Sequence, residues 1–191
     1  MKLHIFNPEH DISLAQNNPN QTPSRAALQI RNDLDFIPYI WADQCDVVLV
    51  NDVMKAYEAV EKLRLKDKNV SFIDADILEK YSDEIDAILP WGWDCAIKEH
   101  LKRLGISQTL LPSSKQLSEI RNLNNRKASI NWLLFLKAHL PYATTVGEAY
   151  YYNNINDLCA KAKEIGKAVI KAPWSGSGRG LRFTDRNIST V

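Results

Sequence analysis

Short apolar runs separated by amphipathic stretches define the first part of the chain. The clearest run, DVVLV at 46–50, is continuous and rich in β-branched residues, and shorter runs lie at 3–6, 70–73 and 87–89. Continuous apolar runs of this length are typical of parallel strands covered on both faces. The pattern therefore predicts four strands in the first 90 residues.

Helical spacing appears between these runs. Thr22-Pro23 suits the start of a helix towards Leu34, and apolar positions recur at helical spacing from Val53 to about Leu65. The loop Pro90-Trp91-Gly92-Trp93-Asp94 leads into a helix that ends at Gly105. Strands that alternate with helices predict an open, mostly parallel α/β sheet with right-handed crossovers over residues 1–112.

The pattern changes after residue 112. A short strand is predicted at 109–111, and a largely helical stretch from Lys115 to Leu140, stopped by Pro141, makes 113–140 a helical connector. Residues 141–191 start a second α+β region. It has a predicted strand at 149–152, a helix at 156–165 stopped by glycine, and a final strand-loop-strand unit.

Composition excludes several classes of protein. With 24 basic and 23 acidic residues the net charge is +1, so no global field attracts nucleic acid or an anionic membrane. Three separated cysteines without a CxxC pair argue against a zinc site and give no disulfide framework. The first residues do not spell a secretory signal and no run has membrane-spanning length, so we expect a cytoplasmic protein.

The segment from Ala168 to Thr184 contains the most specific chemistry. Glycine at alternate positions permits unusual backbone torsions and removes side chains that would keep an anion from the amides. Lys171 adds a compact positive charge, and Arg179 adds a planar fork of donors suited to phosphate. We predict a hairpin that wraps nucleotide phosphates with the loop residues Ser175, Gly176, Ser177, Gly178, Arg179 and Gly180. The alternative is a hairpin of small residues without a ligand.

Two other phosphate-binding motifs do not match this spelling. A Walker loop needs Gly-Lys, then Ser or Thr and a helix, whereas Arg179 follows Gly178 and a strand-like LRFT follows Gly180. The dinucleotide fingerprint GxGxxG opens a helix, but here GxGxG lies between two strands. A glycine-rich hairpin that folds over phosphates fits better.

The spelling VIKAPWSGSGRGL at 169–181 resembles the ATP-grasp superfamily, in which a strand with a nucleotide-binding lysine precedes a loop of small residues. Asn125-Arg126-Lys127 at a helix start, followed by Leu140-Pro141, is similar to another segment of that family. The resemblance implies that Lys127 and Lys171 contact ATP and that Mg²⁺ accompanies it. It also implies that residues 1–112 form a Rossmann-like pre-ATP-grasp domain, followed by an incomplete ATP-grasp subdomain.

The resemblance implies a reaction as well. ATP-grasp ligases phosphorylate a carboxylate and let an amine or similar nucleophile displace the phosphate, with a small-molecule acceptor. Their magnesium-binding residues lie well downstream of the glycine-rich loop, whereas this sequence stops at Val191. We therefore expect a truncated, N-terminal part of a longer ligase that is inactive by itself. Its last two strands would lack their usual partners, which a second copy in a homodimer is one way to supply.

Candidate substrate residues follow the first and fourth predicted strands, because ligands of open α/β sheets bind beyond the carboxyl ends of the strands. They are polar, aromatic or ionisable: Asn7, Glu9, His10, Asp11, Trp91, Trp93 and Asp94. The alternatives are that the two carboxylates after the first strand cap the next element and that the tryptophans fill a domain interface. The segments FNPEHD and PWGWD also look like an ATP-grasp-like family of Bacteroidetes-type bacteria that has no established substrate.

Other chemistries are weaker. A metal site at Glu9-His10-Asp11 is disfavoured, because adjacent residues in one loop rarely converge without ligands from elsewhere. A Ser-His-Asp hydrolase is disfavoured because no GxSxG elbow is present. Two alternatives to a ligase remain. One is a non-catalytic nucleotide- or small-molecule-binding α/β module, and the other is an unrelated α/β domain with an empty loop.

Overall fold

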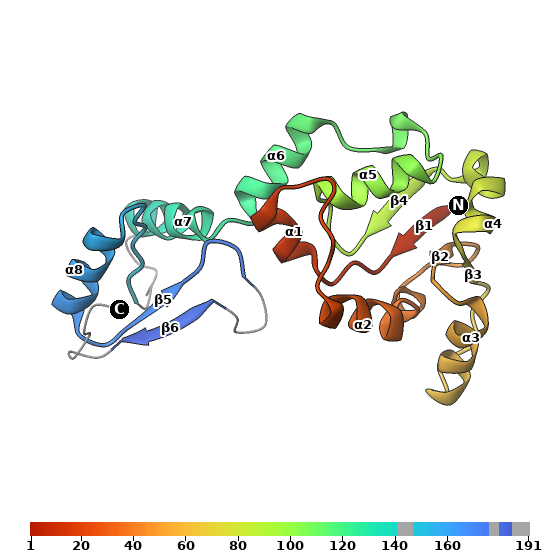
Figure 1. Ribbon diagram of the computed structural model, residues 1–191, viewed down its shortest axis with the longest axis horizontal. Helices are drawn as coiled ribbons and strands as arrows, with labels where there is room; N and C mark the ends of the chain where they lie inside the picture. Colours follow the sequence, from red (N-terminus) through yellow and green to blue (C-terminus); the bar gives the residue numbers. More distant parts are fainter. Residues whose placement is uncertain (141–146, 176–179, 185–191) are drawn as a thin grey trace. The chain divides into compact units, whose positions relative to one another are not determined.

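A parallel sheet of four strands organises the first part of the chain (Figure 1). Leu3 pairs with Val47 on one side and with Ile88 on the other, and Val48 pairs with Phe72. The predicted apolar runs therefore become parallel strands. The strands are β1 (Lys2–Ile5), β2 (Val47–Leu49), β3 (Ser71–Ile73) and β4 (Ala87–Pro90), in the order β3-β2-β1-β4.

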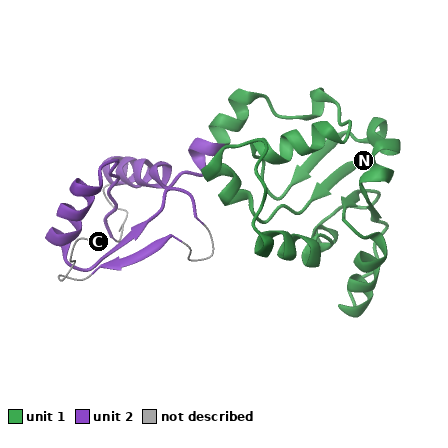
Figure 2. Cartoon of the chain, viewed as in Figure 1, with its two compact units in different colours: residues 1–120 green, residues 121–191 purple. Residues whose placement is uncertain are grey.

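The computed structural model describes residues 1–140, 147–175 and 180–184. The chain divides into two compact units, which we call unit 1 (1–120) and unit 2 (121–191) (Figure 2). Within the described ranges, no helix combines the length and the apolar character needed to cross a membrane.

Five helices accompany the sheet in unit 1. Most begin at a residue whose side chain accepts a backbone N–H of the first turn, as Asp52 does from Lys55 and Asp74 does from Ile77. Such N-caps satisfy donors that have no partner inside the helix. The helices are α1 (His10–Gln16), α2 (Arg25–Leu34), α3 (Val53–Lys62), α4 (Ala75–Tyr81) and α5 (Cys95–Arg103).

The two faces of the sheet carry separate hydrophobic clusters. Val47 joins one cluster together with Leu78 of α4 and Leu101 of α5. The next residue, Val48, joins the other cluster together with Ala56 of α3. Because neighbouring strand residues enter opposite clusters, the sheet is covered on both faces, as its continuous apolar runs predict.

Unit 2 ends in the predicted hairpin. Helix α6 (Ser114–Leu123) spans the boundary between the two units, and α7 (Arg126–His139) and α8 (Ile155–Ile165) follow in unit 2. Strands β5 (Ala168–Lys171) and β6 (Leu181–Thr184) then pair antiparallel. Phe183 is 80% exposed, and among the described hydrophobic residues of unit 2 Ala162 is the buried one. The hairpin and its helices therefore leave much apolar surface uncovered.

Three local predictions were wrong. The segment predicted as a strand at 109–111 contains a 3₁₀ helix, Gln108–Leu110, because the Ser107 hydroxyl caps its first turn. The segment at 149–152 forms no strand, and the sheet of unit 2 consists of β5 and β6 within the described residues. The loop expected at Glu9-His10-Asp11 is instead the start of α1, whose first turn forms when Glu9 O accepts the N–H of Ile12 and Ser13.

A buried hydrogen-bonded pair, His4 and Asp46, lies between β1 and the residue that precedes β2. His4 Nε2 donates to Asp46 Oδ2 at 2.9 Å, and the backbone N–H groups of Lys2 and Asp43 donate to the same carboxylate at 3.0 and 3.2 Å. Burial by itself would raise the pKa of Asp46, but these hydrogen bonds outweigh burial and hold its pKa below the ordinary value.

Replacing Asp46 with asparagine should make stability less sensitive to acid. A carboxyl whose pKa is depressed by folding stabilises the protein above its unfolded pKa of about 3.9 and loses that contribution as pH falls through its folded pKa. Urea unfolding should show that the free energy of unfolding falls less steeply between neutral and strongly acidic pH for Asp46→Asn than for the wild type. Asp83→Asn, at an exposed position, should keep the wild-type slope, and equal slopes for all three proteins would refute the assignment.

Candidate functional site

The order of strands creates a switch point between β1 and β4. The chain runs from β1 outward to β2 and β3, and then returns to place β4 on the other side of β1. In open parallel sheets, ligands bind at the carboxyl ends of the strands where the order reverses. The two loops that carry the predicted substrate residues start at this edge.

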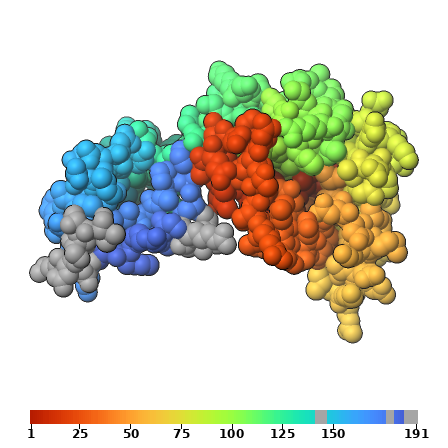
Figure 3. Space-filling view, in the orientation of Figure 1, coloured from red at the N-terminus to blue at the C-terminus, as the bar shows by residue number. Residues whose placement is uncertain are grey.

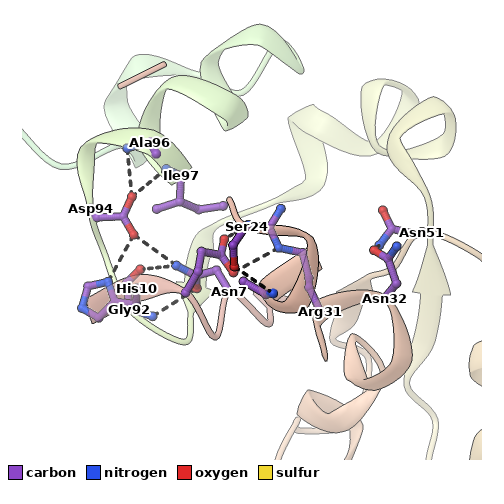
Figure 4. A network of polar contacts seen from close by, with 12 residues as sticks. Asn7, His10, Ser24, Arg31, Asn32, Asn51, Gly92, Asp94, Ala96 and Ile97 are labelled. Carbon is purple, nitrogen blue, oxygen red and sulfur yellow. Dashed lines mark hydrogen bonds and ion pairs between the residues drawn. The ribbon is translucent and has the colours of Figure 1, made fainter. Parts of the chain in front are cut away.

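Asp94 is the centre of a polar cluster at the switch point (Figure 4). Its side chain is 2% exposed, and its Oδ1 accepts the N–H groups of Ala96 and Ile97 at 2.9 Å, which caps α5. Its Oδ2 receives the Asn7 amide at 3.4 Å and His10 Nδ1 at 3.2 Å. One carboxylate thus ties Asp94 to residues that lie 84 and 87 positions away in the sequence.

Asn7 and His10 are fixed further by Gly92. The Asn7 amide donates to Gly92 O at 2.8 Å, and Asn7 Oδ1 accepts Gly92 N–H at 3.2 Å. The His10 ring lies so close to Gly92 that a Cβ there would be 2.3 Å from His10 Cδ2. Because a carboxylate only accepts hydrogen bonds, His10 Nδ1 is the donor in its bond to Asp94. The bonds to Gly92 and Asp94 therefore hold the Asn7 and His10 side chains in place at the switch point.

The other predicted acidic residues lie apart from this cluster. The Glu9 carboxylate is 4% exposed and forms an ion pair with Arg31 of α2, whose Nε donates to Glu9 Oε2 at 3.4 Å. Asp11 lies in the first turn of α1, where a negative charge is favourable. Helices α1 and α5 are in contact, and their surfaces lie side by side in Figure 3. Sequence reasoning missed Arg31, since nothing in the spelling of α2 distinguishes it.

The two tryptophans have different environments. Trp93 is partly buried against the cluster formed by β1, α4 and α5, so it has a packing role. Trp91 is 59% exposed and contacts Phe6 edge to face at 5.6 Å between ring centroids. Trp41, which the sequence did not identify, lies 6.0 Å from Trp91. This exposed aromatic pair next to the switch point offers a stacking surface to a ligand.

In unit 2, Arg126 holds the base of the glycine-rich loop. Its guanidinium donates to Ala172 O at 3.0 Å and to Ser175 O at 2.8 Å, and its backbone N–H donates to Pro173 O. Trp174 Nε1 donates to the backbone of α6 at 3.0 Å. The start of the loop is therefore anchored to the helices that precede it. Arg126 precedes the predicted Lys127 but was not predicted as a functional residue.

The end of the loop also requires its glycine. Gly180 has a φ of +71°, and a Cβ there would lie 2.8 Å from the Cβ of Ala172 on the opposite side of the hairpin. A larger residue would separate the two sides. The predicted phosphate-binding residues Gly176, Ser177, Gly178 and Arg179 lie outside the described residues.

A broad hollow of about 1180 Å³ lies beside the hairpin in unit 2. Its lining combines three consecutive tyrosines with five basic side chains and one acidic one: Tyr150, Tyr151, Tyr152, Arg126, Lys161, Lys167, Lys171, Arg182 and Glu148. Lys127 lies near its edge, with Nζ 5.0 Å from the centroid of the Tyr151 ring. The structure thus brings Lys171 and the ends of the loop to a basic, aromatic surface.

No family of proteins, curated protein or solved structure matches the chain. Among the described residues, no group of three or more His, Cys, Asp or Glu side chains could hold a metal ion.

Proposed function

We propose that unit 2 binds the phosphates of ATP and that the protein is an ATP-dependent carboxylate–amine ligase of ATP-grasp type. The observation that carries the proposal is the basic hollow beside a glycine-containing antiparallel hairpin. Lys171 is the last residue of β5 and lines this hollow, and within the described residues it forms no ion pair. A lysine at this position supports binding of an anion next to the loop.

The balance of charge supports a polyanionic ligand. Five basic side chains line the hollow against one acidic side chain, Glu148. Lys161 is paired with Glu164 at 2.6 Å, and Arg126 is used by the backbone of the loop. Lys167 and Lys171 remain to interact with phosphate oxygens, whereas Arg182 donates to Leu181 O and lies on the opposite face of the hairpin from Lys171. The three tyrosines provide aromatic faces of the kind on which a nucleobase stacks.

The resemblance supplies the reaction. A carboxylate oxygen attacks the γ-phosphorus of ATP, ADP leaves, and an amine then displaces phosphate from the acylphosphate to give an amide. This chain's contribution would be to position the triphosphate and to stabilise its negative charge through Lys171, Arg179 and the amides of the loop. The polar cluster at Asn7, His10 and Asp94 is the candidate site for the acceptor.

Calorimetric titration of the full-length protein with ATP and magnesium tests the proposal. Lys171→Ala should weaken ATP binding about tenfold, the loss of roughly one hydrogen bond between charged groups. Lys163→Ala removes the same charge from an exposed position of α8 outside the hollow and should leave the affinity unchanged. Lack of ATP binding by the folded protein, or equal effects of both variants, would refute the nucleotide site. Binding without turnover would instead support a non-catalytic nucleotide-binding module.

A further inference from the structure

A second cavity, of about 300 Å³, opens in unit 1 at the carboxyl ends of β1, β2 and β3. Its lining includes Ile5 of β1, Leu49 of β2, Val50 directly after β2 and Leu104 after α5. Pockets at the carboxyl edge of a parallel sheet commonly bind small molecules, and this volume lies at the small end of their range. An apolar floor of this kind suits the methylene groups of an organic ligand.

Three carboxylates line the cavity, from Asp35, Asp74 and Asp76. Within the described residues, none of them forms an ion pair. The arginine in the lining, Arg31, is already paired with Glu9. Among the described residues, the lining therefore contains no unpaired arginine or lysine to balance these carboxylates.

Asp35 shows this imbalance most clearly because it is only 6% exposed. It accepts the N–H of Asn51 at 2.7 Å and the Asn51 side-chain amide at 3.3 Å, but neither group is charged. Burial raises the pKa of Asp35, which reflects the cost of keeping this carboxylate ionised away from water. Buried carboxylates are usually paired with a positive charge. A cationic ligand would supply that charge.

The other polar groups leave room for such a ligand. Asp74 uses Oδ1 to cap α4 at 2.9 Å, which leaves Oδ2 available, and Asp76 lies in the first turn of the same helix. His100 also lines the cavity, but burial, Arg31 and Arg103 lower its pKa, so it adds little positive charge near neutral pH. The three carboxylates belong to no described group of side chains that could hold a metal ion.

We propose that this cavity binds a primary aliphatic amine as its ammonium ion, either as a free amine or as the amino group of an amino acid. The ammonium group lies against the carboxylates of Asp74 and Asp76, with its charge also balancing that of Asp35. The methylene chain lies on the apolar floor. In an amino acid, the carboxylate faces Arg31, which also lines the cavity. The inference rests on unit 1 alone and does not depend on nucleotide binding by unit 2.

An NMR titration of the isotope-labelled protein without ATP tests this inference, because chemical shifts detect weak binding. The probes are n-butylamine, n-butanol, butyrate and γ-aminobutyrate. n-Butylamine should shift the amide signals of Asn51, Asp76 and His100, and it should bind about tenfold more tightly than n-butanol or butyrate. Tighter binding of γ-aminobutyrate than of n-butylamine would identify the amino-acid form, and weaker or equal binding would identify the free amine.

Matched substitutions then locate the ammonium group. Asp74→Asn and Asp76→Asn should each weaken n-butylamine binding about tenfold, and asparagine at 74 keeps the ability to cap α4. Asp83→Asn removes the same charge from an exposed position outside the cavity and should leave the affinity unchanged. The inference is overturned if the folded protein binds no amine, if n-butanol binds equally well, or if neither cavity variant alters binding.

Discussion

Replacing Asp94 with alanine should lower the free energy of unfolding of unit 1 by about 3 kcal/mol, the combined effect of a lost helix cap and of buried donors left without an acceptor. The carboxylate is 2% exposed and receives hydrogen bonds from Ala96, Ile97, Asn7 and His10. Asn7 keeps its bonds to Gly92 in the variant, so we expect a destabilised fold rather than complete unfolding.

A second N-cap provides the control. Asp52 caps α3 through one bond to Lys55 N at 3.1 Å and is exposed, so Asp52→Ala should cost only about 1 kcal/mol. Urea unfolding followed by circular dichroism gives the free energies. Amide hydrogen exchange gives a local readout, because the N–H groups of Ala96 and Ile97 should exchange faster in Asp94→Ala. If Asp94→Ala lowers the free energy of unfolding by no more than Asp52→Ala does, Asp94 acts as a helix cap and does not hold the cluster together.

The sequence predicts the sheet well because its signals are local. The run at 46–50 is apolar at every position after Asp46, and such a run is stable only where both faces are covered. The hairpin at 168–184 is predicted for a similar reason, because two short strands flank a loop of small residues. Neither prediction requires contacts between distant residues.

The errors occur where a distant or weak contact decides the structure. Residues 109–111 have an apolar spelling that suits a strand, but no neighbouring strand accepts them and the Ser107 hydroxyl caps a 3₁₀ turn instead. The start of α1 was missed because its first turn lacks a side-chain cap and Pro8 precedes it. Short elements have few internal signals, so their surroundings determine them.

The rule for open sheets pointed to the loops after the first and fourth strands, and the structure brings Asn7, His10 and Asp94 of these loops together. It could not show that Glu9 turns away from them to Arg31, because the partner lies 22 residues along the chain on a different helix. The pairing of a carboxylate with one particular arginine depends on packing, and a single sequence does not contain that information.

Replacing Arg31 with alanine should therefore be strongly destabilising. The change leaves the Glu9 carboxylate, 4% exposed, without its counter-charge, and removing one partner of a buried ion pair costs about 3 kcal/mol. Burial lowers the pKa of Arg31, partly offset by Asp94, but an arginine stays charged near neutral pH. Urea unfolding near neutral pH measures the effect. Arg103→Ala is the control, because Arg103 is 59% exposed and pairs with Glu99 at 3.7 Å, an arrangement worth less than about 1 kcal/mol.

A double variant separates the lost charge from lost packing. If the cost of Arg31→Ala comes from an unpaired buried carboxylate, Glu9→Gln in the same chain should restore part of the stability, because a neutral amide is easier to bury. If the cost comes from the aliphatic part of the arginine, the second substitution should restore nothing. Equal stabilities of Arg31→Ala and Arg103→Ala would show that the Glu9–Arg31 pair contributes no more than a surface pair. In that case the contact between Arg31 of α2 and Glu9, the residue before α1, would not be needed to maintain the structure of the switch point.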